Sequence, residues 1–311
     1  MTSDTGTHGH HSNHGHQHGR HDHDFDWEEM AELLEREAEL HSGYLKEAAG
    51  WLRDGLLHGP EAPGTVSRVL DVGSGPGVVT ALLARYFPDA ETVAVDGTPE
   101  LLERVRARAA SLGLEERVRT HHAELPDGLG TLETLGGAEL IWASQTVHHI
   151  GDQQAALDGL ARALRPGGLL AVAERGLSRR SLPRDIGIGR PGLEARLEAA
   201  LEDWFTGMRD ELPGSVRVVE DWPGMLARAG LTPAGSRSFV IDLPAPLDAR
   251  AREHVHATMS RFRDGVGDGL SSEDNRTLDA LLDADAETGI LRRPDAFYLS
   301  TITVHTARAP Q

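Results

Sequence analysis

Cysteine is absent from the sequence, and several kinds of chemistry are absent with it. A chain without thiols cannot form disulfide bonds, thiolate metal sites or cysteine nucleophiles. Proteins of reducing compartments commonly lack disulfides. We therefore expect a cytoplasmic protein whose chemistry does not depend on sulfur side chains.

Long apolar runs are absent as well. No stretch approaches the roughly 18 apolar residues of a membrane-spanning helix, and the first residues lack the apolar core of a signal peptide. We expect a soluble chain with no membrane partner.

Positive charge is scarce. The chain has 31 Lys and Arg residues against 49 Asp and Glu residues, a formal net charge of −18 at pH 7. Such a surface repels the phosphates of nucleic acids and of anionic membranes, so we expect neither as a partner and favour a small molecule. The 311 residues, 39% of them hydrophobic, are enough for a buried core in one large or two modest domains.

Residues 1–24 consist mainly of Gly, His, Ser, Thr and Asp, with almost no apolar side chains. A segment of this composition cannot bury enough surface to offset its ordering entropy, so we predict a disordered tail. Imidazoles bind Zn, Ni or Cu, which leaves weak metal binding or metal sensing as an alternative to a merely solvated segment. The histidines concerned are His8, His10, His14, His16, His18, His21 and His23.

The remaining chain divides by its hydrophobic periodicity. Residues 25–60 have apolar side chains at helical spacing and predict two amphipathic helices that form a cap. Residues 61–311 alternate strand and helix patterns, which is typical of an α/β domain. We predict strands at 66–72, 91–96, 117–120, 138–143, 169–174, 237–241 and 297–306, and helices at 78–87, 99–112, 152–164 and 221–229.

Two stretches exceed a minimal α/β fold. They are residues 176–215, which include a predicted helix at 193–212, and residues 248–290, which contain two more predicted helices. Insertions of this length usually have a function. In an open α/β sheet, ligands bind outside the carboxyl ends of the strands. We predict that both insertions, together with the N-terminal helices, form a lid over that edge.

The most informative segment begins with the apolar strand pattern at Val69–Val72 and continues through Gly73, Gly75 and Gly77. A helix pattern follows, and then a second strand that ends in Asp96. Strand, glycine turn, helix and strand make half of a nucleotide-binding unit. The glycines allow left-handed backbone and close ligand approach, and the carboxylate can accept hydrogen bonds from ribose hydroxyls.

The spacing of this turn separates two classes of nucleotide ligand. A dinucleotide fingerprint is Gly-x-Gly-x-x-Gly, whereas this turn has the order Asp71-x-Gly73-x-Gly75-x-Gly77. A carboxylate beside the turn repels a pyrophosphate but attracts a cationic amino group. The segment resembles the first motif of the class I S-adenosylmethionine-dependent methyltransferases, whose cofactor has an ammonium, a sulfonium and no phosphate. A nicotinamide-dependent dehydrogenase is disfavoured on the same grounds.

The resemblance implies a Rossmann-like α/β fold, with a mostly parallel seven-stranded sheet, helices on both faces and an antiparallel last strand. It also implies S-adenosyl-L-methionine as the cofactor. By this resemblance, the glycine turn faces the methionine part of the cofactor, and the acid after the second strand faces its ribose. The loop after the third strand faces the adenine amine, and the end of the fourth strand lies beside the sulfonium. The implied cofactor-binding residues are Asp71, Gly73, Ser74, Gly75, Gly77, Asp96, Gly97, Ala123, Glu124, Leu125, Ser144 and Gln145.

Acid–base candidates follow the fourth predicted strand. His148 and His149 lie a few residues beyond it, near the place to which the methyl group would point, and histidine titrates near neutrality. Each is a candidate for a catalytic base, and the alternatives are hydrogen bonding of the loop itself or lining of the cofactor. Tyr44 and Arg175 are candidate substrate contacts, with a packed helix face and a surface ion pair as their respective alternatives.

We therefore predict an enzyme that transfers a methyl group from S-adenosylmethionine to a small molecule by direct displacement. Oxygen is the first choice of acceptor atom, with nitrogen and carbon as alternatives, and a histidine would help to deprotonate an oxygen acceptor. The reaction requires no metal. A metal-responsive protein that uses the His-rich tail, and decarboxylation or cyclisation on the same fold, stay open as other functions, as does a homodimeric state.

Overall fold

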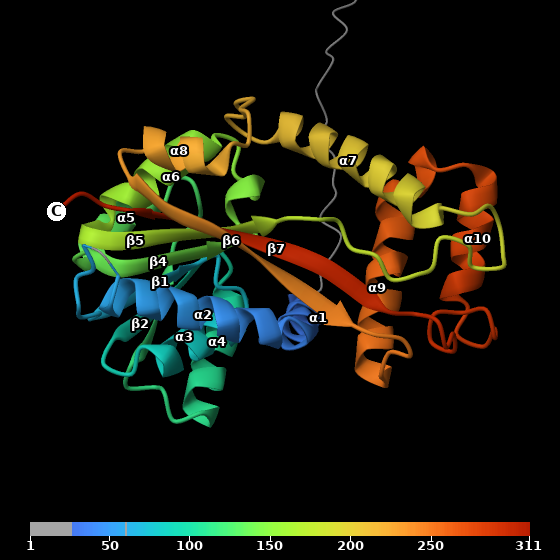
Figure 1. The fold of residues 1–311 in the computed structure, drawn as a ribbon, viewed down its shortest axis with the longest axis horizontal. Helices are drawn as coiled ribbons and strands as arrows, with labels where there is room; N and C mark the ends of the chain where they lie inside the picture. The colour runs from blue at the N-terminus through green and yellow to red at the C-terminus, as the bar shows by residue number, and fades with distance from the viewer. Residues whose placement is uncertain (1–26, 60) are drawn as a thin grey trace, which may run out of the picture.

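The structure, a computed structural model, describes residues 27–59 and 61–311. Its centre is a seven-stranded sheet with the strand order β3-β2-β1-β4-β5-β7-β6 (Figure 1). Every neighbouring pair is parallel except the two pairs that β7 makes. The predicted Rossmann-like α/β fold with an antiparallel last strand is thereby confirmed. The strands are β1 (Arg68–Val72), β2 (Glu91–Asp96), β3 (Val118–His122), β4 (Ala138–Ser144), β5 (Leu164–Arg175), β6 (Thr232–Leu243) and β7 (Tyr298–Arg308).

The central strands are buried on both faces, which explains their almost continuous apolar sequences. Nearly every residue of β1 and β4 is buried, whereas most of β6, at the edge of the sheet, is exposed. Two strands begin earlier than their apolar patterns predict, β5 at Leu164 and β6 at Thr232. The reason is backbone pairing, because Leu164 still pairs with Ala138 and Thr232 with Arg308.

Helices cover both faces of the sheet, as predicted (Figure 1). Alternate residues of β1 point to opposite layers. Val69 packs with side chains of α2 and α3, whereas Leu70 and Val72 pack with side chains of α5, α6 and α8. The helices of the two layers are α2 (Ser42–Leu57), α3 (Val78–Tyr86) and α4 (Pro99–Ser111) on one face, and α5 (Leu129–Leu132), α6 (Gln153–Arg162) and α8 (Trp222–Arg228) on the other.

The first helix and the inserted helices gather at one end of the sheet (Figure 1). This is the end at which the parallel strands terminate, and α1 contacts α9, α3 and α4 there, while α7 contacts α9. The two stretches that exceed a minimal α/β fold therefore lie together at the edge where such sheets bind ligands. The helices concerned are α1 (Trp27–Leu40), α7 (Leu193–Glu211), α9 (Ala249–Val266) and α10 (Ser272–Leu282).

The predicted tail at residues 1–24, with its candidate metal-binding histidines, lies outside the described residues. Within the described ranges, no helix combines the length and the apolar character needed to span a bilayer. In the same part of the chain, no group of three or more His, Cys, Asp or Glu side chains is arranged to hold a metal ion.

Candidate active site

The turn between β1 and α3 has the left-handed backbone that its glycines predict. The angle φ is +71° at Gly73, +54° at Gly75 and +79° at Gly77. A Cβ on Gly73 would lie 2.1 Å from Oγ1 of Thr146, and a Cβ on Gly77 would lie 2.8 Å from a methyl group of Val105. Glycine is therefore required at both positions for steric as well as conformational reasons.

Asp96, at the end of β2, holds this turn in place. Its Oδ2 accepts a hydrogen bond from the Gly75 amide and its Oδ1 accepts one from the Thr98 amide, both at 2.9 Å. Each oxygen keeps a further lone pair, so the carboxylate is oriented and still able to accept from two ribose hydroxyls. The hydroxyl of Ser74, in the same turn, is buried and has no hydrogen-bond partner among the described residues. These features fit a ligand that contains a nucleoside, such as S-adenosylmethionine.

Asp71 lies beneath the turn instead of at its surface. The residue is 2% exposed, and its Oδ2 accepts a hydrogen bond of 2.6 Å from the Thr80 hydroxyl in α3. Burial raises the pKa of the Asp71 carboxyl to about 7; the hydrogen bond from Thr80 opposes this rise, and the charge of Asp96 adds to it. A cationic group bound at the turn would favour the ionised form. In the structure the direct contact of Asp71 is with α3.

The loops after β2 and β3 lie against each other. The Ala123 amide donates to the carbonyl of Asp96 at 3.0 Å, and a Cβ on Gly97 would lie 3.4 Å from the Cα of Glu124. Ala123 is buried, Glu124 is exposed, and Leu125 packs partly against the apolar core around α5 and α6. The residues that the resemblance assigns to adenine therefore flank the one that it assigns to ribose.

The end of β4 adjoins the glycine turn. Gln145 has a φ of +51°, which is unusual for a residue with a side chain, and its amide donates to a β5 carbonyl at 2.9 Å. The Thr146 hydroxyl donates to the carbonyls of Ser144 at 2.9 Å and Val72 at 3.3 Å. The side chain of Ser144 is in turn hydrogen-bonded to Tyr44 of α2. Strained backbone persists only where neighbouring structure holds it, and it concentrates at functional sites.

Helix α1 covers the glycine turn. Leu34 of α1 comes within 3.7 Å of the point at which a Gly75 side chain would begin. Glu35, on the same helix, forms ion pairs with Arg104 at 3.4 Å and Arg108 at 2.9 Å, both from α4. These two pairs attach α1 to the half of the sheet that carries the turn.

His148 and His149 form one hydrogen-bonded array with Glu174 of β5. Nδ1 of His148 lies 2.7 Å from Oε2 of Glu174, and Nε2 of His148 lies 3.0 Å from Nε2 of His149. His148 and Glu174 are buried, and His149 is exposed. With Glu174 as a carboxylate, Nδ1 of His148 carries a proton and its Nε2 accepts from His149. This tautomer leaves a lone pair on Nδ1 of His149.

The inserted helix α7 positions this array. Arg209 donates a hydrogen bond to the carbonyl of His148, and the ring of Phe205 lies 5.6 Å from the His148 ring, edge to face. Although the His149 ring is partly exposed, the surrounding protein removes part of its hydration and lowers its pKa to about 4, with further lowering from the charges of His148, Arg175 and Arg209. The His149 imidazole is therefore neutral at pH 7 and able to accept a proton.

The two predicted substrate contacts are placed differently. Arg175 is exposed at the end of β5, 3.9 Å from Glu202 of α7, which is the surface ion pair that we gave as its alternative. Tyr44 is buried in α2 against His41, with 5.7 Å between their ring centroids, and reaches the end of β4 through Ser144.

Some residues of this site could not be predicted from any pattern in the sequence. Thr146 closes on the glycine turn, Glu174 supports His148, and Arg209 holds the histidine loop. Each comes from an element other than the one it serves. No spacing rule connects such residues along the chain.

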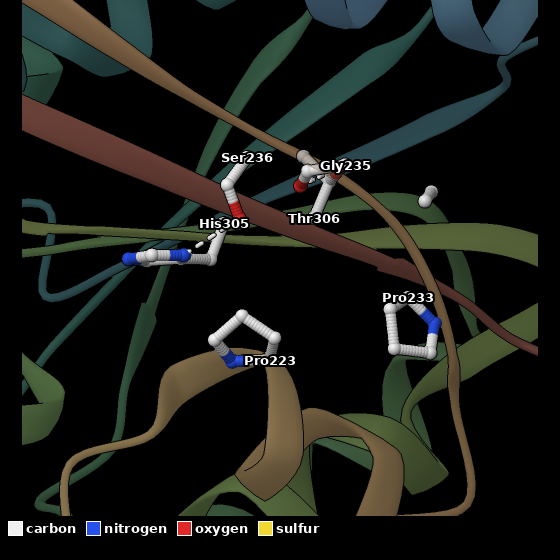
Figure 2. A pocket seen from close by; sticks show the side chains of 7 residues that line it. Pro223, Pro233, Gly235, Ser236, His305 and Thr306 are labelled. Atoms are coloured by element: carbon white, nitrogen blue, oxygen red, sulfur yellow. Dashed lines mark hydrogen bonds between the residues drawn. The ribbon is translucent and has the colours of Figure 1, made fainter.

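A shallow pocket of about 350 Å³ lies beside the edge strand β6, between β6, β7 and the start of α8 (Figure 2). Ser236 and His305 form a hydrogen bond of 2.8 Å within it. None of the residues that line this pocket belongs to the site described above. Its lining residues are Pro223, Pro233, Ala234, Gly235, Ser236, His305 and Thr306.

Known proteins are similar to part of this chain. Residues 69–168 match the family described as a methyltransferase domain. The chain is 37% identical over 103 residues to trans-aconitate 2-methyltransferase of Methylobacterium radiotolerans, which covers 33% of this chain and 36% of that protein. It is 36% identical over 164 residues to methyltransferase GfsG of Streptomyces halstedii, and this alignment covers 53% of this chain and 52% of that protein. The crystal structure of a putative sarcosine dimethylglycine methyltransferase from Galdieria sulphuraria has 19% identity, a TM-score of 0.48 and 88% coverage of both chains.

The matched segment contains the glycine turn, the acid after β2 and the histidine loop. Residues 69–168 form a methyltransferase domain of the class I S-adenosylmethionine-dependent type, in which S-adenosylmethionine is the methyl donor. The predicted family is thus confirmed. The aligned part of the chain spans between about a third and about a half of the length of the two curated relatives named here.

Proposed function

We propose that the chain transfers a methyl group from S-adenosylmethionine to an oxygen atom of a small-molecule acceptor. The observation that carries the proposal is the Asp96 carboxylate, which the amides of Gly75 and Thr98 orient at the rim of the glycine turn. The net charge of −18 supports a small acceptor over a polyanionic one. When bound, S-adenosylmethionine supplies an electrophilic methyl group on a positively charged sulfur.

Methyl transfer is a single displacement, so alignment is the main contribution of the protein. Asp96 binds the ribose hydroxyls, and the exposed carboxylate of Glu124 binds the adenine amine. Ser144 and Gln145 lie beside the reacting atoms at the end of β4. Leu34 and the rest of α1 close the site from above and keep water away from it.

His149 takes the proton of the acceptor hydroxyl on its Nδ1. As that proton arrives, the proton on Nε2 of His149 passes to Nε2 of His148 across 3.0 Å. His148 then carries a positive charge, which the buried carboxylate of Glu174 stabilises at 2.7 Å. One histidine thus faces the acceptor while the other lies beside the counter-charge.

Calorimetry with S-adenosylhomocysteine tests the cofactor assignment. We expect micromolar binding to the wild-type chain, and Asp96→Ala should weaken it by about 1–3 kcal/mol because a charge-assisted pair of hydrogen bonds is lost. Asp89→Ala, at an exposed aspartate after α3, is the matched control and should leave the affinity unchanged. Unchanged affinity in Asp96→Ala, or binding of NADH in place of S-adenosylhomocysteine, would contradict the proposal.

A thermal-shift screen in the presence of S-adenosylhomocysteine then identifies acceptors. Candidates from the screen are incubated with S-adenosylmethionine, and the product is located by mass spectrometry and NMR. An O-methyl product supports the proposed acceptor atom, whereas an N-methyl or C-methyl product assigns another one.

A further inference from the structure

A second set of buried polar side chains lies at the same edge of the sheet, and the chemistry proposed above does not use it. Nε2 of His41 lies 2.8 Å from the hydroxyl of Tyr298, at the start of β7. The ring of His254, from α9, lies 5.9 Å from the ring of Tyr298, edge to face. The guanidinium of Arg179 lies 5.0 Å from the Phe262 ring centroid and 5.9 Å from that of Tyr298. We call these residues the His254 cluster.

The His254 cluster is continuous with the end of β4. The Tyr44 ring packs edge to face against His41, and the Tyr44 hydroxyl is hydrogen-bonded to Ser144. Because β7 runs antiparallel to β5, its first residue, Tyr298, lies at the carboxyl edge of the parallel strands. A molecule bound to the cluster would therefore lie next to the end of β4.

His254 lacks hydrogen-bond partners. The residue is 1% exposed, and neither of its ring nitrogens has a partner within the part of the chain that the structure describes. Burial lowers the pKa of His254 to about 4, with a further contribution from the charge of Arg179, so the ring is neutral at pH 7. A neutral imidazole offers one donor and one acceptor. Buried polar groups are almost always paired, which indicates a partner that the described residues do not supply.

Arg179 lacks a partner of opposite charge. Among the described residues, no carboxylate oxygen lies within 4.0 Å of its guanidinium, whereas the neighbouring Arg180 pairs with Glu198 at 2.5 Å. Glu37 of α1 and Glu194 of α7 are within electrostatic reach of Arg179, but burial raises the pKa of each carboxyl and so favours its uncharged form. The charge of Arg179 is therefore only partly balanced.

We propose that the His254 cluster binds the methyl acceptor, and that this acceptor is a small organic anion. Its anionic group pairs with the guanidinium of Arg179, and a hydroxyl or carbonyl group hydrogen-bonds to His254. Tyr298 and Phe262 provide the aromatic surface against which its carbon skeleton packs. This inference rests on the proposed methyl transfer and specifies its substrate class.

The test uses the full chain saturated with S-adenosylhomocysteine and matched pairs of probes. The pairs are benzoate with methyl benzoate, 4-hydroxybenzoate with its methyl ester, cinnamate with methyl cinnamate, and phenyl phosphate with phenol. By calorimetry we expect at least one anion to bind ~10-fold or more tightly than its neutral partner, because a guanidinium–oxyanion pair is charge-assisted. A carboxylate and the phosphate ester both support the site, and their order identifies the anionic group.

Variants of the cluster make the test specific. Arg179→Gln should abolish the preference for the anion, whereas Arg180→Gln, the control at the paired neighbour, should keep it. His254→Phe should weaken the binding of the preferred anion several-fold. It should leave the melting temperature unchanged or higher, because it removes two unpartnered nitrogens. The second variant keeps the test valid if Arg179→Gln does not fold.

The outcomes separate the two proposals. If the protein binds S-adenosylhomocysteine but no anion binds better than its neutral partner, the anion site is wrong and methyl transfer still stands. The proposed anion site is also wrong if Arg179→Gln still prefers the anion to its neutral partner, or if His254→Phe binds the preferred anion as tightly as wild type does. Failure of the wild-type chain to bind S-adenosylhomocysteine contradicts the proposed function instead.

Discussion

Glu174 and His148 form a buried pair, with 2.7 Å between Oε2 and Nδ1, that connects the core of the sheet to the exposed ring of His149. The other oxygen of Glu174, Oε1, is buried and has no hydrogen-bond partner in the described part of the chain. The hydrogen bond to His148 is therefore the interaction that orients this carboxylate. A carboxylate in this position fixes the orientation of the His148 ring and the nitrogen that carries its proton.

The first prediction concerns this pair. Glu174→Gln keeps a carbonyl oxygen that can accept from His148, so the free energy of unfolding should change by only about 1 kcal/mol. The amide has no charge to stabilise a protonated His148, so kcat should fall by about 10²-fold, a typical contribution of acid–base catalysis. Steady-state kinetics with an acceptor from the screen and urea denaturation give the two values.

Glu202→Gln serves as the control for the loss of a negative charge near the site, because Glu202 is exposed on α7 and 3.9 Å from Arg175. It should retain kcat within about two-fold. If His149→Ala lost activity while Glu174→Gln did not, the relay would be wrong and His149 would act alone. If both variants were fully active, His149 would not be the base.

The second prediction concerns pH. Loss of hydration in the folded protein is the main cause that lowers the pKa of His41 to about 3, of His149 to about 4 and of His254 to about 4. In an unfolded chain histidine has a pKa of about 6.5. Between the two values the unfolded chain binds protons that the folded chain does not. The contribution of these neutral histidines to the free energy of unfolding is therefore fully present above pH ~6.5. It decreases as the pH falls toward their folded-state pKa values.

His254 allows this effect to be isolated. For this residue alone, the linkage amounts to about 2 kcal/mol between pH 7.5 and pH 5. Urea denaturation at several pH values should show that wild type loses more stability on acidification than His254→Phe by about this amount. Asp71 and Glu37, whose raised pKa values act in the opposite direction, are present in both proteins and cancel in the difference. Parallel stability curves would show that His254 is not buried as a neutral ring.

The third prediction compares two glycines with similar backbone angles. Gly73 has a φ of +71° and Gly113 a φ of +67°, but only Gly73 has a neighbour, Thr146, in the way of a Cβ. Gly113→Ala should lower the free energy of unfolding by about 1 kcal/mol through backbone strain alone. Gly73→Ala should lower it by about 1–3 kcal/mol more and weaken S-adenosylhomocysteine binding more than ~10-fold.

Urea denaturation and calorimetry of the two glycine variants measure these effects. Equal losses of stability would mean that the approach of Thr146 to the turn does not constrain it. Normal cofactor affinity in Gly73→Ala would show that the cofactor does not bind at this turn.

Local patterns predicted the nucleotide-binding half of the fold well. From Val69 to Asp96 the strand, the turn, the helix and the second strand follow one another without insertion, and each has its own signal in composition or spacing. The edge strands were less well predicted. β6 continues to Thr232 because β7 supplies pairing partners there, and pairing between distant segments leaves no mark in either segment alone.

The sequence by itself determined the succession of strands and helices along the chain, the glycine turn and the acid that faces this turn. Each of these depends on backbone angles and burial periodicity, which neighbouring residues set. Only the tertiary structure decided which titratable groups meet. Glu174 lies beside His148 from 26 residues away, and His41 meets Tyr298 across 257 residues. Such pairs depend on how whole helices and strands pack around the carboxyl edge of the sheet, and packing is a property of the assembled fold.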